Sequence, residues 1–73
     1  MASNSILVMI EGGRAHYIGY GDSNTLAKNK ILLESSSTKR FILEEVTPDD
    51  DIIGLRSDTD LLTERFKKYI TTR

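Results

Sequence analysis

The chain of 73 residues contains no cysteine, no tryptophan, one proline and one histidine. Without cysteine it can form neither a disulfide nor a thiolate metal site, and a single histidine excludes a histidine-rich metal cluster. We therefore expect no bound metal, and no motif in the sequence points to a cofactor. Chains of this length bury only about 60% of their unfolded surface, so stability must come from tight packing or from self-association.

Long apolar runs are also missing. The longest, Ile6 to Ile10, is far shorter than the roughly 18 residues that indicate a membrane span. The amino terminus has neither the basic region nor the apolar stretch of a signal peptide, so we expect a cytoplasmic protein without membrane contact. The hydrophobic (38%) and charged (29%) fractions are typical of globular domains. We predict a single compact domain over residues 1–73, with residues 1–4 frayed.

The net charge of −1 is distributed unevenly along the chain. Acidic side chains gather in residues 44–60, among them Glu44, Asp49, Asp50 and Asp51. Such a block of one sign can steer a partner of the opposite sign. The segment could therefore face a basic partner, including a nucleic-acid-binding protein for whose site it would compete.

Two extended runs between Ser5 and Tyr20 flank Gly12-Gly13, a two-residue hairpin turn of the kind that needs positive φ. Folding about this turn sets Glu11 opposite Arg14 and continues in strict alternation as far as Leu7 opposite Ile18. One face of the hairpin then carries Ile6, Val8, Ile10, Ala15 and Tyr17, and the other carries Leu7, Met9, His16, Ile18 and Tyr20. Both faces are largely apolar, whereas a hairpin with one face exposed to water needs only one apolar face.

Helical spacing of apolar residues predicts a helix over residues 24–34. A short run with β-branched and aromatic residues predicts a third strand over residues 40–46. Helix is the alternative for the second segment, because leucine and glutamate are good helix formers.

Residues 47–54 are interpreted as a short helical turn, begun by Thr47 and stopped by Gly54. A calcium loop is the competing interpretation of the three aspartates, but the segment lacks the alternate ligand spacing of such a loop. The amphipathic pattern of residues 57–73 predicts a terminal helix, capped by Ser57 or Asp58.

These elements predict an α+β fold of order β-β-α-β-α, with a three-stranded sheet in strand order 2-1-3. A right-handed crossover places the first helix on one face of the sheet, and we expect both helices to pack on that face. The other face would then expose an apolar patch for a protein partner or a second copy of the chain. The candidate contact residues there are Met9, His16, Ile18 and Tyr20. In the alternative arrangement, the terminal helix or the amino-terminal arm covers the second face and closes the monomer.

Residue types needed for catalysis are present but not arranged in a recognisable set. His16 is the only imidazole, and it lies in the middle of a predicted strand. Neither a nucleophile elbow nor a phosphate-binding loop is present, and the adjacent Glu44 and Glu45 point to opposite faces of a strand. A site combining His16, Asp22 and Tyr17 is the catalytic alternative, but a lone histidine supports no mechanism by itself. We expect a non-enzymatic protein.

The segment GYGDSNTLAKN, residues 19–29, has a Gly-x-Gly-x-Ser turn that leads into a helix with an Ala-Lys pair. In these features it resembles the strand-to-helix junction of double-stranded-RNA-binding domains. The resemblance implies phosphate contacts by Lys28 and Lys30, and Tyr17 is one of the aromatic residues that could stack a base. The family's paired lysines after the serine are replaced here by asparagine and threonine, and its first helix is missing.

The sequence therefore predicts a small regulatory or inhibitor-type protein that acts by protein–protein binding, similar in size and composition to antitoxins, phage-encoded inhibitors and accessory subunits. The open sheet face or the acidic residues 44–60 would make the contact. The alternative is a nucleic-acid-binding module.

Overall fold

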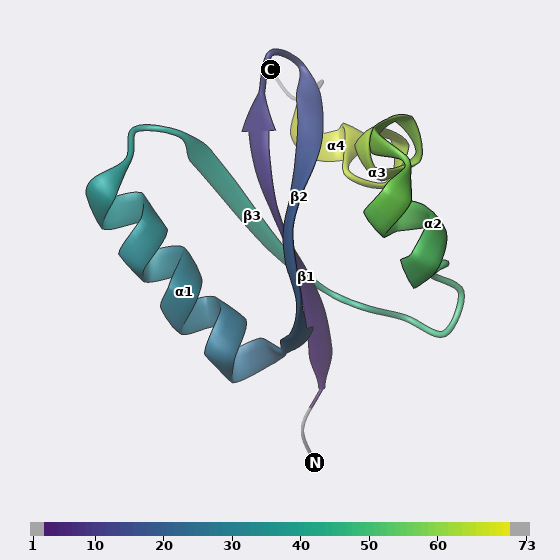
Figure 1. Cartoon of the computed structure of the whole chain (residues 1–73), viewed down its shortest axis with the longest axis horizontal. Coiled ribbons are helices and arrows are strands. Elements are labelled where there is room, and N and C mark those ends of the chain that lie inside the picture. Colours follow the sequence, from purple (N-terminus) through teal and green to yellow (C-terminus); the bar gives the residue numbers. More distant parts are fainter. Residues whose placement is uncertain (1–2, 71–73) are drawn as a thin grey trace.

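The computed structural model describes residues 3–70 of the chain (Figure 1). In chain order its elements are β1 (Asn4–Glu11), β2 (Arg14–Asp22), α1 (Ser23–Ser36), β3 (Arg40–Glu45), α2 (Ile52–Ser57), α3 (Thr59–Arg65) and α4 (Lys67–Ile70). The strands form an antiparallel sheet in the order β2-β1-β3. The predicted α+β fold and strand order are therefore confirmed, with the apolar β1 in the centre.

A two-residue turn joins β1 to β2. Gly12 and Gly13 both have positive φ, 65° and 75°, which is the conformation of a type I′ turn and one that glycine adopts without steric cost. Beside the turn Glu11 pairs with Arg14, as predicted. Local turn chemistry thus sets the register of this end of the hairpin.

The hairpin register changes further from the turn, where β2 carries one extra residue. Leu7 pairs with Gly19 rather than with Ile18, so the predicted Leu7–Ile18 pair is wrong and Ile18 forms a β-bulge. The alternation of side chains along β2 shifts by one residue after the bulge. Tyr20 consequently pairs with Ile6 and lies on the same face as Ile6, opposite to the face predicted for it.

The bulge has a packing reason. The helix α1 crosses this part of the sheet, and the side chain of Leu26 lies 3.4 Å from the position that a Cβ atom would take on Gly19. Strict alternation would place the bulky Ile18 there. Because of the extra residue, Gly19 lies beneath α1 instead, and Leu26 can pack against it in a buried position.

The helices lie on both faces of the sheet, with α1 on one side and α2 and α3 on the other (Figure 1). The expectation that two helices pack on one face is therefore wrong, and the alternative, in which the terminal helix covers the second face, is correct. The physical reason is that the hairpin has two apolar faces, each of which is removed from water only when a helix covers it. An uncovered sheet face was predicted to bind a partner or a second copy. No such face is present in the described part of the chain.

Each face of the sheet has its own hydrophobic cluster. The cluster under α2 and α3, here called the first cluster, contains Ile6, Val8, Ala15, Leu55, Leu62 and Phe66. The cluster under α1, here called the second cluster, contains Leu7, Leu26 and Phe41, with Met9, Leu33 and Leu43 packed against it. Successive side chains of a strand point to opposite faces, so β1 supplies residues to both clusters.

The start of α2 differs from the prediction. Residues 47–50 form a turn, closed by a hydrogen bond from Asp50 N to Thr47 O (3.1 Å). The helix begins only after Asp51, whose carboxylate accepts a hydrogen bond from Gly54 N (3.2 Å). Gly54 therefore lies inside the helix and does not stop it.

Close packing explains a glycine at this position. A Cβ atom on Gly54 would lie 2.6 Å from Asp51 Oδ2 and 2.9 Å from Leu61 Cδ2. Any larger residue would push α2 away from α3 or displace the carboxylate that caps α2.

The predicted terminal helix is broken. It begins after Asp58, one of the two predicted caps, but α3 ends at Arg65 and α4 resumes at Lys67. Between them Phe66 departs from helical geometry, with φ −106° and ψ 20°, and is completely buried in the first cluster. Residues 71–73, which belonged to the predicted helix, lie outside the described residues.

The remaining boundaries are close to the predictions. The helix expected over residues 24–34 and the strand expected over residues 40–46 are both present as α1 and β3. The predicted fraying is wrong for Asn4, which belongs to β1, and for Ser3, whose carbonyl oxygen accepts a hydrogen bond from Ser23 N (2.9 Å). Residues 1 and 2 lie outside the described residues.

Candidate functional site

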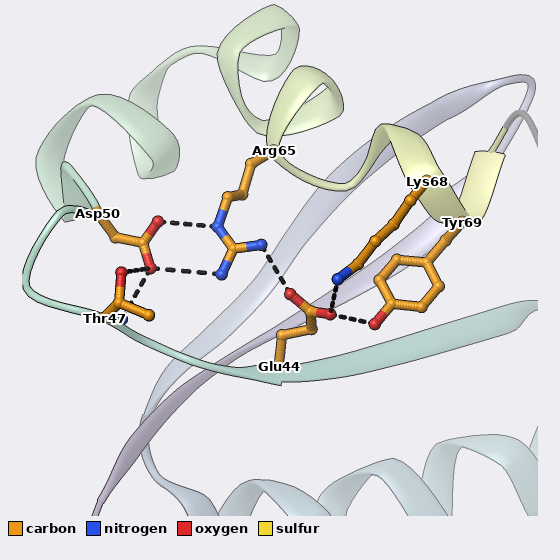
Figure 2. Close-up of polar contacts among 6 residues, drawn as sticks. All are labelled: Glu44, Thr47, Asp50, Arg65, Lys68 and Tyr69. Atoms are coloured by element: carbon orange, nitrogen blue, oxygen red, sulfur yellow. Dashed lines mark hydrogen bonds and ion pairs between the residues drawn. The ribbon is translucent and has the colours of Figure 1, made fainter.

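A network of charged side chains joins β3 to α3 (Figure 2). Arg65, in α3, donates through Nη1 to Glu44 Oε1 on β3 (2.7 Å) and through Nε to Asp50 Oδ1 in the following loop (2.8 Å). Thr47 N donates to the other carboxylate oxygen of Asp50 at 2.9 Å. One guanidinium group thus ties the sheet, the loop of residues 46–51 and α3 together.

Glu44 also accepts hydrogen bonds from α4. Its Oε2 atom lies 3.0 Å from Lys68 Nζ and accepts a hydrogen bond from the hydroxyl of Tyr69. Burial raises the pKa of Glu44, but the hydrogen bonds from these two groups and from Arg65 outweigh burial, so its pKa is lowered. Hydrogen bonding to Arg65 lowers the pKa of Asp50 against the smaller opposing effect of burial. Both carboxylates are therefore held in the charged form.

Two residues predicted to contact a partner, Glu44 and Asp50, are thus occupied within the chain. Their side chains are mostly buried, at 15% and 9% exposure. Their role is structural: through Arg65, Asp50 holds the loop of residues 46–51 against α3, and Glu44 holds β3 against α3.

A groove of about 330 Å³ opens between this loop and the helices α2 and α3. We call it the acidic groove, and it is lined by Asp49, Asp50, Asp51, Leu55, Leu61, Glu64 and Arg65. Asp50 is paired with Arg65, and Asp51 caps α2. The carboxylates of Asp49 and Glu64 are exposed, and they take part in none of the side-chain hydrogen bonds or ion pairs found within residues 3–70.

Two leucines give the acidic groove an apolar part. Leu55 is buried and belongs to the first cluster, whereas Leu61 is 41% exposed. An apolar centre bordered by polar and charged groups is the general arrangement of protein interfaces.

A second groove, of about 300 Å³, lies between α1 and the edge strand β2. We call it the α1–β2 groove, and it is lined by Leu7, Ile18, Gly19, Leu26, Asn29, Leu32 and Leu33. None of these lining residues is charged, and Asn29 supplies the one polar side chain among them. The side chains of Leu32 and Ile18 remain well exposed.

The four residues predicted to line an open sheet face do not form one surface. Met9 packs, half-buried, against the second cluster, and His16 is its partner across the hairpin. Ile18 lies in the α1–β2 groove. Tyr20 lies on the opposite face, where its hydroxyl accepts a hydrogen bond from Asn4 Nδ2 (3.2 Å).

The residues of the catalytic alternative are not brought together either. The Nε2 atom of His16 lies 3.3 Å from Glu11 O, beside the hairpin turn. Tyr17 belongs to the opposite face and packs against the first cluster. Asp22 lies at the far end of β2, where its carboxylate caps α1 by accepting a hydrogen bond from Thr25 N (3.0 Å).

The residues proposed to contact nucleic acid lie on different faces. Lys28 and Lys30 belong to α1, where Lys30 Nζ pairs with Glu34 at 2.8 Å. Tyr17 is half-buried on the other face, and the Arg56 guanidinium lies 5.6 Å from the centre of its ring. The tyrosine and the two lysines therefore do not share a surface.

Sequence reasoning missed four residues of the acidic groove: Leu55, Leu61, Glu64 and Arg65. No local signal marks Arg65, because its partners lie 15 and 21 positions away in the chain. The α1–β2 groove did have a signal. Residues 31–33 are three successive apolar residues in a helix, and they cannot all face the sheet.

No family model matches the chain, and no curated protein and no solved structure shows significant similarity to it. Within residues 3–70 no group of three or more histidine, aspartate or glutamate side chains is placed to hold a metal ion. Over the same residues, every helix is too short or too polar to cross a bilayer. A function must therefore be inferred from the surface of the chain, and we base it on the acidic groove and the α1–β2 groove.

Proposed function

We propose that this chain is a small non-enzymatic regulatory or inhibitor-type protein that binds a protein partner through the acidic groove. The partner presents a basic segment carrying one bulky apolar side chain. The observation that carries the proposal is the placement of an exposed leucine, Leu61, in the same groove as the carboxylates of Asp49 and Glu64.

Negative charge predominates around this groove. Asp49, Asp51 and Glu64 line it, whereas the one basic lining residue, Arg65, is already paired with carboxylates inside the chain. Charges at the rim of an interface raise the rate of association with an oppositely charged partner and disfavour partners of like charge. We therefore expect a basic partner, and an interaction that weakens as the salt concentration rises.

The apolar part of the groove supplies affinity that exposed charges alone do not. Covering the exposed surface of Leu61 contributes about 25 cal/mol for each Å² removed from water. The loop beside it is already held by the hydrogen bonds of Asp50 to Arg65 and Thr47. Binding to a wall that is fixed in advance loses less conformational entropy than binding to a mobile loop.

This recognition chemistry suggests how binding alone would regulate a partner. Clustered lysine and arginine side chains are the electrostatic signature of nucleic-acid-binding surfaces. A chain that covers such a basic segment competes with the nucleic acid for it, and inhibition follows without catalysis.

Short synthetic peptides test the proposal. Each carries one leucine or phenylalanine flanked by lysine and arginine, and its binding is followed by fluorescence anisotropy at about 0.15 M salt. We expect the double substitution Asp49→Lys, Glu64→Lys to weaken binding at least about tenfold, because it reverses both exposed rim charges. The circular dichroism spectrum should not change, since neither side chain has a partner within residues 3–70. Asp50 and Asp51 are left intact because one holds Arg65 and the other caps α2.

The control is Glu34→Lys, Glu45→Lys, which adds the same charge on α1 and β3, outside the groove. It also breaks the Lys30–Glu34 ion pair, which is partly exposed and contributes little to stability. We expect it to retain affinity within about threefold, because at about 0.15 M salt the Debye length is only about 8 Å and charges outside the groove act weakly on a peptide bound within it. Equal weakening by the two double variants would mean that net charge alone attracts the peptides. That result, or no binding of any basic peptide, would refute the proposal.

A further inference from the structure

The helix α1 presents apolar side chains to solvent as well as to the sheet. Ile31 and Leu32 are 65% and 66% exposed, although they lie well inside a helix of 14 residues. On β2, Ile18 is 41% exposed and lines the same groove as Leu32. Contiguous exposed apolar surface of this kind marks an interaction site in soluble proteins.

We propose that the α1–β2 groove is the contact surface of a symmetric dimer of this chain, in which Leu32 of each copy enters the groove of the other. A two-fold interface has to be self-complementary, because the same patch serves on both sides. This surface holds both parts that are needed. Leu32 is an apolar side chain exposed to solvent, and the groove of about 300 Å³ that it borders can receive one.

The charges at this surface favour a second copy as the occupant. No charged residue lines the groove, so two copies meet there without the repulsion that two acidic grooves would produce. On α1, Lys30 is paired with Glu34 at 2.8 Å, and the exposed Lys28 is not among the residues that line the groove. The side chain of Asn29 carries both donors and an acceptor, so the same side chain of a second copy can satisfy it.

The surface is also long enough for a dimer. A standard interface takes about 800 Å² from each partner, roughly one sixth of the 4878 Å² that this chain exposes. The helix α1 spans about 21 Å and the nine residues of β2 about 30 Å, from the rise per residue of each element. The acidic groove borders helices of only six and seven residues, which suits a short segment. It lies on the opposite face of the sheet and stays accessible in the dimer.

Sedimentation velocity over a concentration series tests the dimer. We expect the wild-type chain to move from its mass of 8.2 kDa toward twice that value as its concentration approaches the millimolar range. Leu32→Lys should raise the dissociation constant at least about tenfold, because it places a charge in an apolar contact. The variant should stay folded, since Leu32 is 66% exposed in the single chain. A wild-type chain that remains monomeric at millimolar concentration overturns the proposal.

The matched control is Ile53→Lys, at a residue that is 80% exposed on α2 and lies outside the groove. It should dimerise like the wild type. A dimer that survives Leu32→Lys, or that is lost equally in Ile53→Lys, overturns the assignment to this surface.

Two further measurements locate the contact. In a mixture of isotope-labelled and unlabelled chains, we expect intermolecular nuclear Overhauser effects between methyl groups of Leu32 and Ile18. If a sample shown to be dimeric lacks them, the α1–β2 groove is not the dimer contact. The variant Asp49→Lys, Glu64→Lys should dimerise unchanged. Self-association and peptide binding are thereby tested separately.

Discussion

Replacing Phe66 with alanine is expected to lower the free energy of unfolding by about 3–5 kcal/mol. The ring is completely buried in the break between α3 and α4, in the same cluster as Leu55 and Leu62. Its removal leaves a cavity against the sheet, and a close-packed core relaxes only partially around such a cavity. The whole domain is expected to have only about 4–11 kcal/mol of stability, so the variant should lie near the limit of folding. Urea unfolding followed by circular dichroism measures the difference.

The control for this prediction is another aromatic residue replaced by alanine. Tyr20 is 37% exposed on β2, and we expect Tyr20→Ala to cost less than about 1 kcal/mol. A Phe66→Ala variant as stable as Tyr20→Ala would show that Phe66 does not occupy the core.

Replacing Arg65 with alanine is expected to cost about 2–3 kcal/mol at neutral pH. The change leaves Asp50 and Glu44 charged and mostly buried without their shared partner. It also removes the guanidinium that lies 5.4 Å from the centre of the Phe66 ring. The cost should be below that of breaking a fully buried ion pair, because the side chain of Arg65 keeps 24% exposure. The melting temperature should fall by about 10–20 °C.

The pH dependence of this cost identifies its origin. The pKa values of Asp50 and Glu44 are lowered in the folded chain, so their stabilisation is complete above the ordinary carboxylate pKa values and is lost as the pH falls through the lowered ones. The difference in the free energy of unfolding between wild type and Arg65→Ala should therefore become smaller as the pH falls below about 4. If the difference in stability were unchanged under strongly acidic conditions, Arg65 would stabilise the fold through the packing of its aliphatic stem and not through its charge.

An exposed arginine in an ion pair provides the control. Arg14 pairs with Asp60, and their side chains are 50% and 80% exposed. Solvent screens this pair, so Arg14→Ala should cost less than about 1 kcal/mol. If the two arginine variants were equally stable, the network around Glu44 would have no special role.

Local chemistry was enough to predict part of the fold. The turn at Gly12-Gly13, the pairing beside it and the cap at Asp58 all depend on neighbouring residues, and all are confirmed. The central position of β1 also followed from sequence, because a near-continuous apolar run is typical of a central strand.

The errors come from contacts between distant parts of the chain. The bulge at Ile18 depends on the approach of α1 to Gly19, and Gly54 stays inside a helix because Leu61 packs against it. The amphipathic pattern of the terminal helix shows that it covers something, but not which face of the sheet it covers. The two apolar faces of the hairpin were better explained by a helix on each face than by an open interface.

The same limit applies to the grooves. The acidity of residues 44–60 was evident, but sequence could not separate the carboxylates with internal partners from those at the surface. Asp50 and Asp49 are neighbours in the chain, yet one pairs with Arg65 and the other is exposed. That distinction arises only when α3 packs against the loop.

The central place of β1 has a consequence for the lifetime of its amide protons. Of the three strands only β1 has a hydrogen-bonded neighbour on each side, and Ile6, Leu7 and Val8 are buried beneath helices on both faces. The outer strands can open singly by fraying away from β1, whereas β1 is released from both neighbours only when the whole sheet comes apart. Deuterium uptake at β1 therefore reports global unfolding, and the slowest amides of the chain measure its stability in plain water, without denaturant.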